Sequence, residues 1–178
     1  MCRPPPPGHA EQVTQQLETP ASTRPKRPKS GWPIAIGLIV LSLVPVIAGA
    51  FRVTELTVGA EITEANARFF HSPVPVIAHV IGASIYLMVG ALQFVPGLRT
   101  RRWHRYAGRV LVPAGIVTGL SGIWMAVFYP RPALDTGMRV FFGVLMVTFI
   151  ALGLRAILRR DVAAHRAWMI RGYAIGIG

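Results

Sequence analysis

The stretch from Val74 to Leu98, VPVIAHVIGASIYLMVGALQFVPGL, contains no Asp, Glu, Lys or Arg. A helix needs about 20 mostly apolar residues to cross about 30 Å of hydrocarbon, so this stretch predicts a transmembrane span. Outward from it, further apolar runs occur at 33–51, 107–129 and 138–158, and a shorter one at 168–178. At about 1.5 Å of rise per residue, the last run covers only part of a crossing. The sequence therefore predicts an all-α, polytopic transmembrane helical bundle with four full spans and the start of a fifth.

The composition indicates the same class of protein. Of the 178 residues, 52% are hydrophobic and only 15% are charged, which lies outside the usual range of soluble domains. Residues 1–32 differ from the rest because they are rich in proline and basic residues and lack apolar periodicity. We interpret them as a disordered cytoplasmic tail. The predicted organisation is this tail followed by a transmembrane helical domain at 33–178.

Positive charge is distributed unevenly along the predicted topology. The 19 lysines and arginines outnumber the 7 acidic residues and give a net charge of +12. Five of the 19 lie before the first span, five in or within one turn of the connection between the second and third spans, and five in or within about one turn of the connection between the fourth and fifth. By the positive-inside rule these segments are cytoplasmic, so we expect a multi-pass protein of the bacterial inner membrane with a cytoplasmic N-terminus. Contact with anionic lipids explains this charge better than nucleic-acid binding does.

The residue types limit the chemistry that the chain can perform. Cys2 is the only cysteine, so neither an internal disulfide nor a thiolate metal site can form within one chain. The sequence contains no glycine-rich phosphate loop, no His-Glu-x-x-His motif and no nucleophile elbow, which argues against hydrolytic chemistry. Any cofactor must rely on histidine and oxygen ligands. Whether the chain is an enzyme stays open at this point.

A polar stripe runs along the span that contains Val74 to Leu98. His79, Tyr86 and Gln93 recur at intervals of seven residues, which keeps them close to one face of a helix. An ionisable side chain inside a span is costly in lipid and faces protein or water. We therefore expect the stripe to point to the bundle centre. There it could bind haem through His79, bind a quinone, relay protons, or only form hydrogen bonds between helices.

Two connections between spans resemble each other. GLRTRRWHR, which ends at Arg105, and GLRAILRRDVAAHR, which ends at Arg166, each place His-Arg before the next span. A parallel repeat of two helical hairpins would bring His104 and His165 to equivalent positions about the bundle centre, where two imidazoles can ligate one haem iron. The alternative is a collar of polar residues at the level of the lipid headgroups. Four neighbouring arginines are candidates to hold haem propionates or anionic lipid: Arg105, Arg109, Arg166 and Arg171.

Glycine pairs at four-residue spacing predict close contacts between helices. They occur at Gly115 and Gly119 and again at Gly172 and Gly176. Because small residues let helix backbones approach closely, we expect tight packing against a neighbouring helix. The neighbour can belong to this chain, to a second copy of it, or to another subunit of a membrane complex.

Three segments of the sequence resemble a known family. AHVIGASIYLMVGALQF at 78–94, WHRYAGRV at 103–110 and HRAWMIRGYA at 165–174 are together similar to bacterial predicted membrane proteins of the family called domain of unknown function 2306. The resemblance extends over about Pro75 to Gly178 and implies a polytopic membrane protein, without assigning an activity. The matching positions are His79, Gln93, His104, Gly108, Arg109, His165, Arg166, Trp168, Met169, Ile170 and Arg171.

These observations leave three functions open. The first is a redox membrane protein that binds haem b or a quinone, with His79 as the leading ligand and with His104 and His165 as a pair. The second is a non-catalytic accessory or assembly subunit of a membrane complex, which contacts anionic lipid through its arginines. The third is a transporter of protons or small molecules along the polar stripe. No metal is predicted other than a haem iron.

Overall fold

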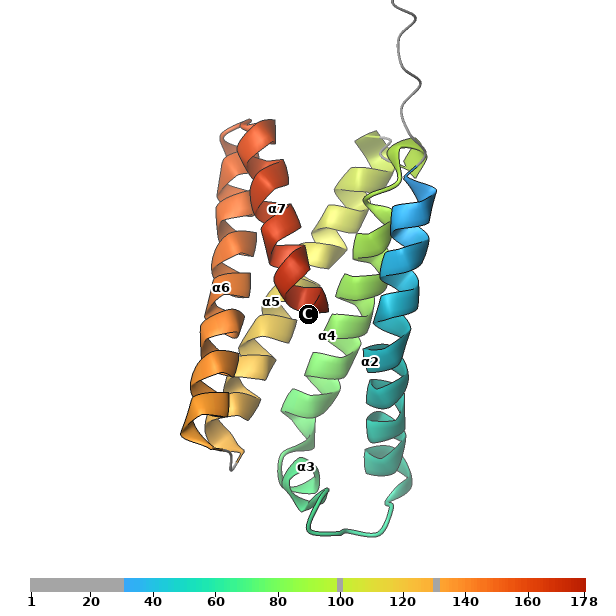
Figure 1. Ribbon diagram of the computed structural model, residues 1–178, viewed down its shortest axis with the longest axis vertical. Helices are drawn as coiled ribbons and strands as arrows, with labels where there is room; N and C mark the ends of the chain where they lie inside the picture. The colour runs from blue at the N-terminus through green and yellow to red at the C-terminus, as the bar shows by residue number, and fades with distance from the viewer. Residues whose placement is uncertain (1–30, 99–100, 130–131) are drawn as a thin grey trace, which may run out of the picture.

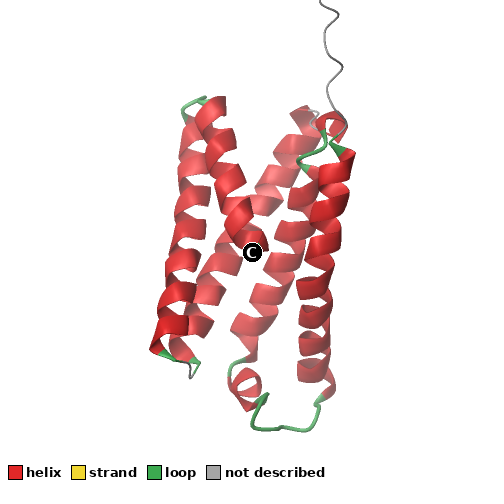
Figure 2. Cartoon of the chain, viewed as in Figure 1, coloured by secondary structure: helices red, strands yellow, loops and turns green. Residues whose placement is uncertain are grey.

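The computed structural model of the protein describes residues 31–98, 101–129 and 132–178, which form six α-helices and a short 3-10 turn (Figure 1). These residues contain no strand, so the all-α prediction is confirmed (Figure 2). The predicted tail lies outside the described residues up to position 30. The helices are α2 (Trp32–Val58), α3 (Ala67–His71), α4 (Pro73–Leu92), α5 (Arg101–Phe128), α6 (Ala133–Leu158) and α7 (Val162–Ile177), and the 3-10 turn is η1 (Pro96–Leu98).

Four helices are long and apolar enough to cross a membrane, as predicted. They are α2, α4, α5 and α6, with 20 to 27 residues in their candidate spans. α7 has 16 residues, and the C mark in Figure 1 shows that it ends near the middle of the bundle. By length and composition, the chain is therefore a multi-pass membrane protein with a shorter additional helix.

Four helix ends differ from the predicted span boundaries by six or seven residues, and one of them is the end of α4, which stops at Leu92 instead of Leu98 and is followed by η1. α2 continues past the apolar run to Val58 and stops where Gly59 adopts a φ of 70°, which favours glycine. α5 begins at Arg101, before its apolar run. α7 begins at Val162 because the Oδ1 atom of Asp161 accepts a hydrogen bond of 2.9 Å from a backbone N–H of the first turn. Capping groups, rather than the limits of hydrophobicity, set the end of α2 and the start of α7.

The last four helices form a ring. α4, α5, α6 and α7 each pack against the next helix in sequence, and a smaller contact between α4 and α7 closes the ring (Figure 1). α2 packs against α4. α5 and α7 therefore lie across the ring from each other. The buried cluster at its centre consists of Tyr86, Ala107, Leu111, Ala114, Met146, Ile150 and Tyr173.

The glycine pairs make these helix contacts close, as predicted. A Cβ atom at Gly115 would lie 2.7 Å from the Tyr86 ring, and one at Gly176 would lie 2.9 Å from the same ring. On α5, a Cβ at Gly119 would lie 2.5 Å from Val147 of α6. Since real Cβ atoms do not approach so closely, these positions require glycine. Gly115 and Gly176, one from each pair, leave the space in which the Tyr86 ring packs between α5 and α7.

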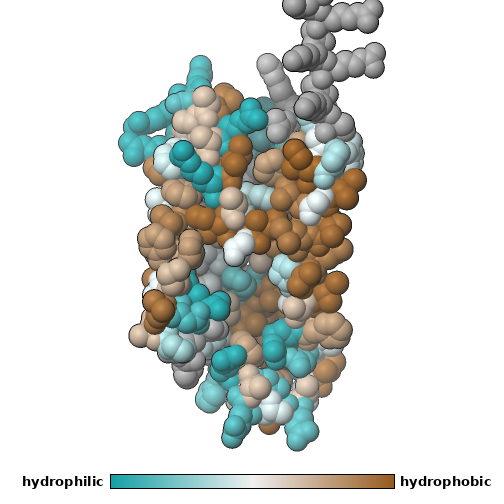
Figure 3. Space-filling model, viewed as in Figure 1, coloured by the Kyte–Doolittle hydropathy of each residue, from teal (hydrophilic) through white to brown (hydrophobic). Residues whose placement is uncertain are grey.

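The outer surface of the helices is largely apolar. Val44 on α2 and Leu134 on α6 are 72% and 80% exposed. Figure 3 shows hydrophobic side chains over much of the middle of the visible face, with hydrophilic side chains gathered toward the two ends. Exposed apolar surface of this extent is rare in soluble monomers. Contact with lipid is therefore the role of this surface.

Candidate functional site

A cavity of about 400 Å³ lies between α4, α5 and α7. It is near the end of the bundle that carries the connections at 93–101 and 159–161, which we call the arginine end. The volume falls within the range of small-molecule and cofactor sites, about 300–1,000 Å³. The cavity is lined by Tyr86, Gly90, Gln93 and Phe94, by His104, Gly108, Leu111 and Val112, and by Val162, His165, Arg166, Met169, Ile170 and Tyr173.

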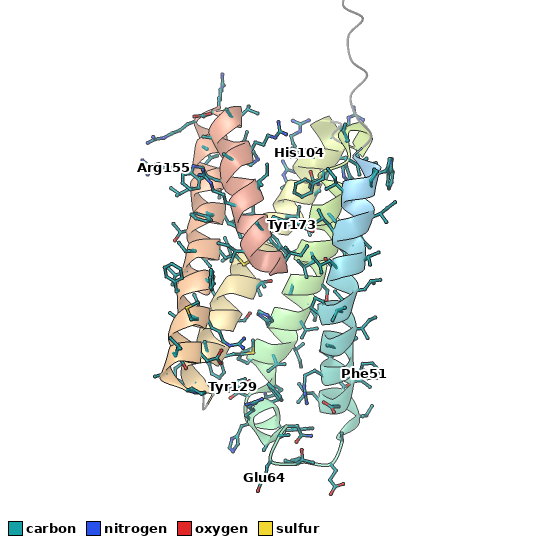
Figure 4. All side chains as sticks on the ribbon, in the orientation of Figure 1. Phe51, Glu64, His104, Tyr129, Arg155 and Tyr173 are labelled. Carbon is teal, nitrogen blue, oxygen red and sulfur yellow. The ribbon has the colours of Figure 1, made fainter. Side chains whose placement is uncertain are left out.

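Two histidines lie close together at this cavity. His104 lies in the first turns of α5 and His165 in the first turns of α7, and both line the cavity. Their ring centroids are 6.3 Å apart, and the ring planes are perpendicular at 90°. In Figure 4, His104 lies at the arginine end, above Tyr173. The structure thus brings together two histidines that are separated in sequence by two transmembrane helices.

Each of these imidazoles is oriented through its Nδ1 atom. The Nδ1 of His165 donates to the backbone carbonyl oxygen of Gly153 on α6 at 2.8 Å. The Nδ1 of His104 donates to the Oε1 atom of Gln93 at 2.6 Å. Because Nδ1 carries the hydrogen in each neutral ring, the lone pair is on Nε2. This is the tautomer that metal-binding histidines adopt when an outer partner fixes the ring.

Aromatic side chains line the cavity on the side of the bundle centre. The Tyr173 hydroxyl donates to the backbone oxygen of Leu87 at 2.8 Å, which ties α7 to α4. Its ring packs against Phe94 at a centroid distance of 5.3 Å and against Tyr86 at 5.7 Å. Gly90 is required here because a Cβ atom would overlap the Tyr173 ring. This contact holds the two helices in fixed positions beside the cavity.

Open space lies next to Gly108 on α5. A Cβ atom added at this glycine would meet no atom within 4 Å, although Gly108 lines the cavity. The neighbouring wall residues Leu111 and Val112 are apolar. One wall of the cavity therefore combines a helix backbone without a side chain and an aliphatic surface, which suits a flat, apolar ligand.

The four candidate arginines occupy different positions. Arg166 lines the cavity. The guanidinium of Arg171 lies 4.7 Å from the centroid of the Trp168 ring, and that of Arg109 lies 5.8 Å from the Tyr106 ring. Arg105 is exposed on α5, and Figure 4 shows Arg155 at the outer side of α6. Of the four, Arg166 is the one that borders the cavity.

His79 belongs to a different environment. Its Nδ1 atom lies 3.0 Å from the backbone oxygen of Thr118 and 3.2 Å from the hydroxyl of Ser121, both on α5. The hydroxyls of Thr118 and Ser121 themselves donate to Ala114 and Val117 of their own helix. His79 therefore links α4 to α5 through a hydrogen bond to the neighbouring backbone.

The polar stripe of α4 does not form one continuous path. At about 1.5 Å of rise per residue, the 14 positions between His79 and Gln93 correspond to about 21 Å along the helix. Tyr86 lies between them, is only 2% exposed, and is packed against Gly115 and Gly176. The stripe does face the other helices of the bundle, as predicted. Of its three members, Gln93 and Tyr86 border the cavity and His79 does not.

Sequence reasoning found Tyr86, Gln93 and Arg166 but missed other residues that form or support the walls of the cavity. Gly153 offers the backbone acceptor for His165, and Tyr173 forms part of the wall, but neither was a candidate. Gly108 and Met169 were noted only as matching positions of a family. The signal available for Tyr173 was its place two turns after His165, on the same face of α7. A backbone carbonyl acceptor such as that of Gly153 leaves no signal in a sequence.

The described residues contain no group of three or more His, Cys, Asp or Glu that could hold a metal ion. The histidine pair alone is thus too small a ligand set for a bare metal, because zinc sites use about three or four protein ligands. The pair is sufficient for a metal ion whose other ligands are supplied by a bound cofactor.

The sequence was compared with known proteins. A family described as predicted membrane protein (DUF2306) matches residues 76–178, which is more than half of the chain. The match covers α4 to α7 and with them the whole cavity, and it leaves α2 outside. Neither a curated protein nor a solved structure matches the chain. The chain therefore belongs to the DUF2306 family of predicted membrane proteins.

Proposed function

We propose that the protein binds haem b between His104 and His165 and carries single electrons in the membrane. The observation that carries this proposal is the pair of imidazoles that α5 and α7 bring together at the cavity, with ring centroids 6.3 Å apart. Histidine is a common axial ligand of haem iron, and helices that face each other in a bundle commonly supply the ligands of a buried cofactor.

The spacing of the two rings agrees with axial ligation. An imidazole nitrogen binds a transition metal at about 2 Å, which places the ring centroid about 3 Å from the metal. Two axial imidazoles on one iron therefore have centroids roughly 6 Å apart. The distance of 6.3 Å is close to this value.

The ligand set favours an iron porphyrin over a bare metal ion. The porphyrin supplies the equatorial nitrogens, so two histidines complete the coordination of the iron. The space beside Gly108 and the aliphatic wall of Leu111 and Val112 suit the macrocycle. When bound, haem supplies reversible one-electron chemistry. The protein's own part is to hold the ring and to orient the histidines through Gln93 and Gly153.

A quinone suits the same cavity less well. Its carbonyl oxygens need hydrogen-bond donors, and the Nδ1–H groups of His104 and His165 are already directed to Gln93 and Gly153. Arg166 lines the cavity and remains as a donor, so a quinone would use the arginine and leave the histidine pair without a role. The lone pairs on the Nε2 atoms suit a metal rather than another acceptor oxygen. A transport path is also disfavoured, because the close-packed Tyr86 separates the cavity from His79.

The orientation of the protein is part of the proposal. The positive-inside rule favours an orientation with the arginine end toward the cytoplasm, in a membrane that we propose to be the bacterial inner membrane. The haem would then lie near the cytoplasmic surface, where it could exchange electrons with a partner or with another subunit of a membrane complex. The exposed arginines of this end would contact anionic lipid headgroups.

A haem titration tests the proposal. The purified protein in detergent should bind haem and show the absorption spectrum of a six-coordinate, low-spin iron. His104→Ala and His165→Ala should each abolish this spectrum. His71→Ala is the control, since His71 is exposed on α3 and should leave the spectrum unchanged. Absence of haem binding, or equal spectra in all three variants, would refute the proposal and favour a non-catalytic accessory subunit.

A further inference from the structure

One arginine stands at the mouth of the cavity. Arg166 lines the cavity together with its neighbour in sequence, His165, and its side chain is exposed. It is therefore accessible to solvent and close to the ligand space at the same time. The cavity is otherwise lined mainly by aliphatic, aromatic and glycine residues. A guanidinium in this position can contribute to the choice of ligand.

The protein supplies no carboxylate partner for Arg166 among the described residues. The ion pairs there join Arg52 to Glu55 and Arg139 to Asp135, and both lie at the end of the bundle opposite the arginine end. The nearest acidic residue in sequence, Asp161, caps α7 by accepting a hydrogen bond from a backbone N–H. The charge of Arg166 is thus balanced by solvent or by a ligand.

The other arginines of this end differ from Arg166. Arg171 stacks on Trp168 and Arg109 lies over Tyr106, and neither lines the cavity. Such cation–π contacts suit an interfacial position, where the headgroups of anionic lipids are the natural partners. Arg159 is exposed at the end of α6 and also lies outside the cavity lining.

We infer that the ligand of this cavity carries carboxylate groups and that Arg166 binds one of them at the cavity mouth. This inference rests on the proposed haem site and deepens it. Haem b has two propionates on one edge of an otherwise apolar ring. Arg166 would turn this edge toward the arginine end, while the apolar edge enters the cavity beside Gly108. Arginine recognises carboxylates through paired, charge-assisted hydrogen bonds, so it selects an acidic porphyrin over a neutral one.

The test compares iron protoporphyrin IX with its dimethyl ester, which has the same ring and iron but no free carboxylate. Both are titrated into the purified protein in neutral detergent, and the dissociation constants are obtained from the Soret band. The wild-type protein should bind the diacid about tenfold more tightly than the diester, which corresponds to about 1.4 kcal/mol. Arg166→Gln should remove this preference and leave the affinity for the diester unchanged. Arg159→Gln is the matched control and should keep the preference.

The outcomes separate this inference from the haem proposal. Equal binding of the diacid and the diester by the wild-type protein, with both lost in His104→Ala, overturns the role of Arg166 and leaves the haem site intact. Absence of binding by either porphyrin overturns both. A further titration adds phosphatidylglycerol to the micelles. The preference should persist, whereas a preference that disappears in anionic lipid would assign Arg166 to a headgroup phosphate and overturn the inference.

Discussion

The two histidine regions of the bundle differ in what surrounds the imidazole. At the arginine end, His104 and His165 border a cavity of about 400 Å³. In the other half of α4, His79 is held against α5 by Thr118 and Ser121. One region borders space for a ligand, whereas in the other the imidazole is hydrogen-bonded to the neighbouring helix. A histidine inside a span therefore does not by itself mark a site, and the space beside it has to be known.

One glycine in each of the two histidine regions shows the same difference in the space around it. A Cβ atom at Gly108 would meet nothing within 4 Å, whereas one at Gly122 would lie 3.3 Å from the His79 ring. The first glycine leaves a cavity open, and the second lets a helix approach a side chain. Substitutions beside the cavity should thus weaken ligand binding, whereas substitutions near His79 should lower the stability of the fold.

The largest effect is expected from filling the cavity. Gly108→Leu places a side chain in the open space, so haem binding should fall by at least about 100-fold, or about 2.7 kcal/mol. The fold should persist, because leucine favours a helix over glycine by up to about 1 kcal/mol. Haem titration and thermal unfolding in detergent measure the two effects. The matched control is Gly137→Leu on α6, which also enters open space but outside the cavity. Full haem binding by Gly108→Leu would show that the ligand does not occupy this space.

The second effect concerns the orientation of His104. Gln93→Leu removes the acceptor of its Nδ1–H group, and loss of such an outer partner typically weakens metal binding by about 10- to 100-fold. We expect a loss in this range together with a change in the reduction potential of the bound haem. Gln93→Glu keeps an acceptor and should retain binding. An unchanged potential and affinity in Gln93→Leu would contradict the role of this hydrogen bond.

The third effect is on the packing between the two regions. Gly115→Val would drive a methyl group into the Tyr86 ring, and overpacking of this kind costs about 1–3 kcal/mol. The melting temperature should fall accordingly. Gly37→Val on α2 meets no atom within 4 Å and serves as the control. Equal melting temperatures for the two variants would argue against the close contact of α4 with α5.

The smallest effect is expected at His79. His79→Ala removes one hydrogen bond between helices, worth about 0.6–2 kcal/mol in membrane proteins. The protein should lose a small amount of stability and keep its haem spectrum. A haem spectrum that changes in His79→Ala but not in His104→Ala would reverse the comparison and return His79 to the role of leading ligand.

Much of the fold could be predicted from the sequence. Long apolar runs determine α2, α4, α5 and α6, because few other structures satisfy the backbone in lipid. The ends were less predictable: Asp161 and Gly59 set them through capping, which does not depend on hydrophobicity. The repeat indicated that His104 and His165 could meet. The distance between the two imidazoles could not be predicted. It depends on how α5 and α7 are placed relative to each other and on the hydrogen bond from Tyr173 to Leu87.

The electron paramagnetic resonance spectrum of the ferric, haem-loaded protein tests the central claim most directly. Ligation by both His104 and His165 would give a six-coordinate, low-spin ferric iron, whereas loss of either imidazole would leave a high-spin iron. We predict a low-spin signal in the wild-type protein and its replacement by a high-spin signal in both His104→Ala and His165→Ala. A high-spin signal in the wild type, or a low-spin signal that survives in both variants, would contradict ligation by this histidine pair.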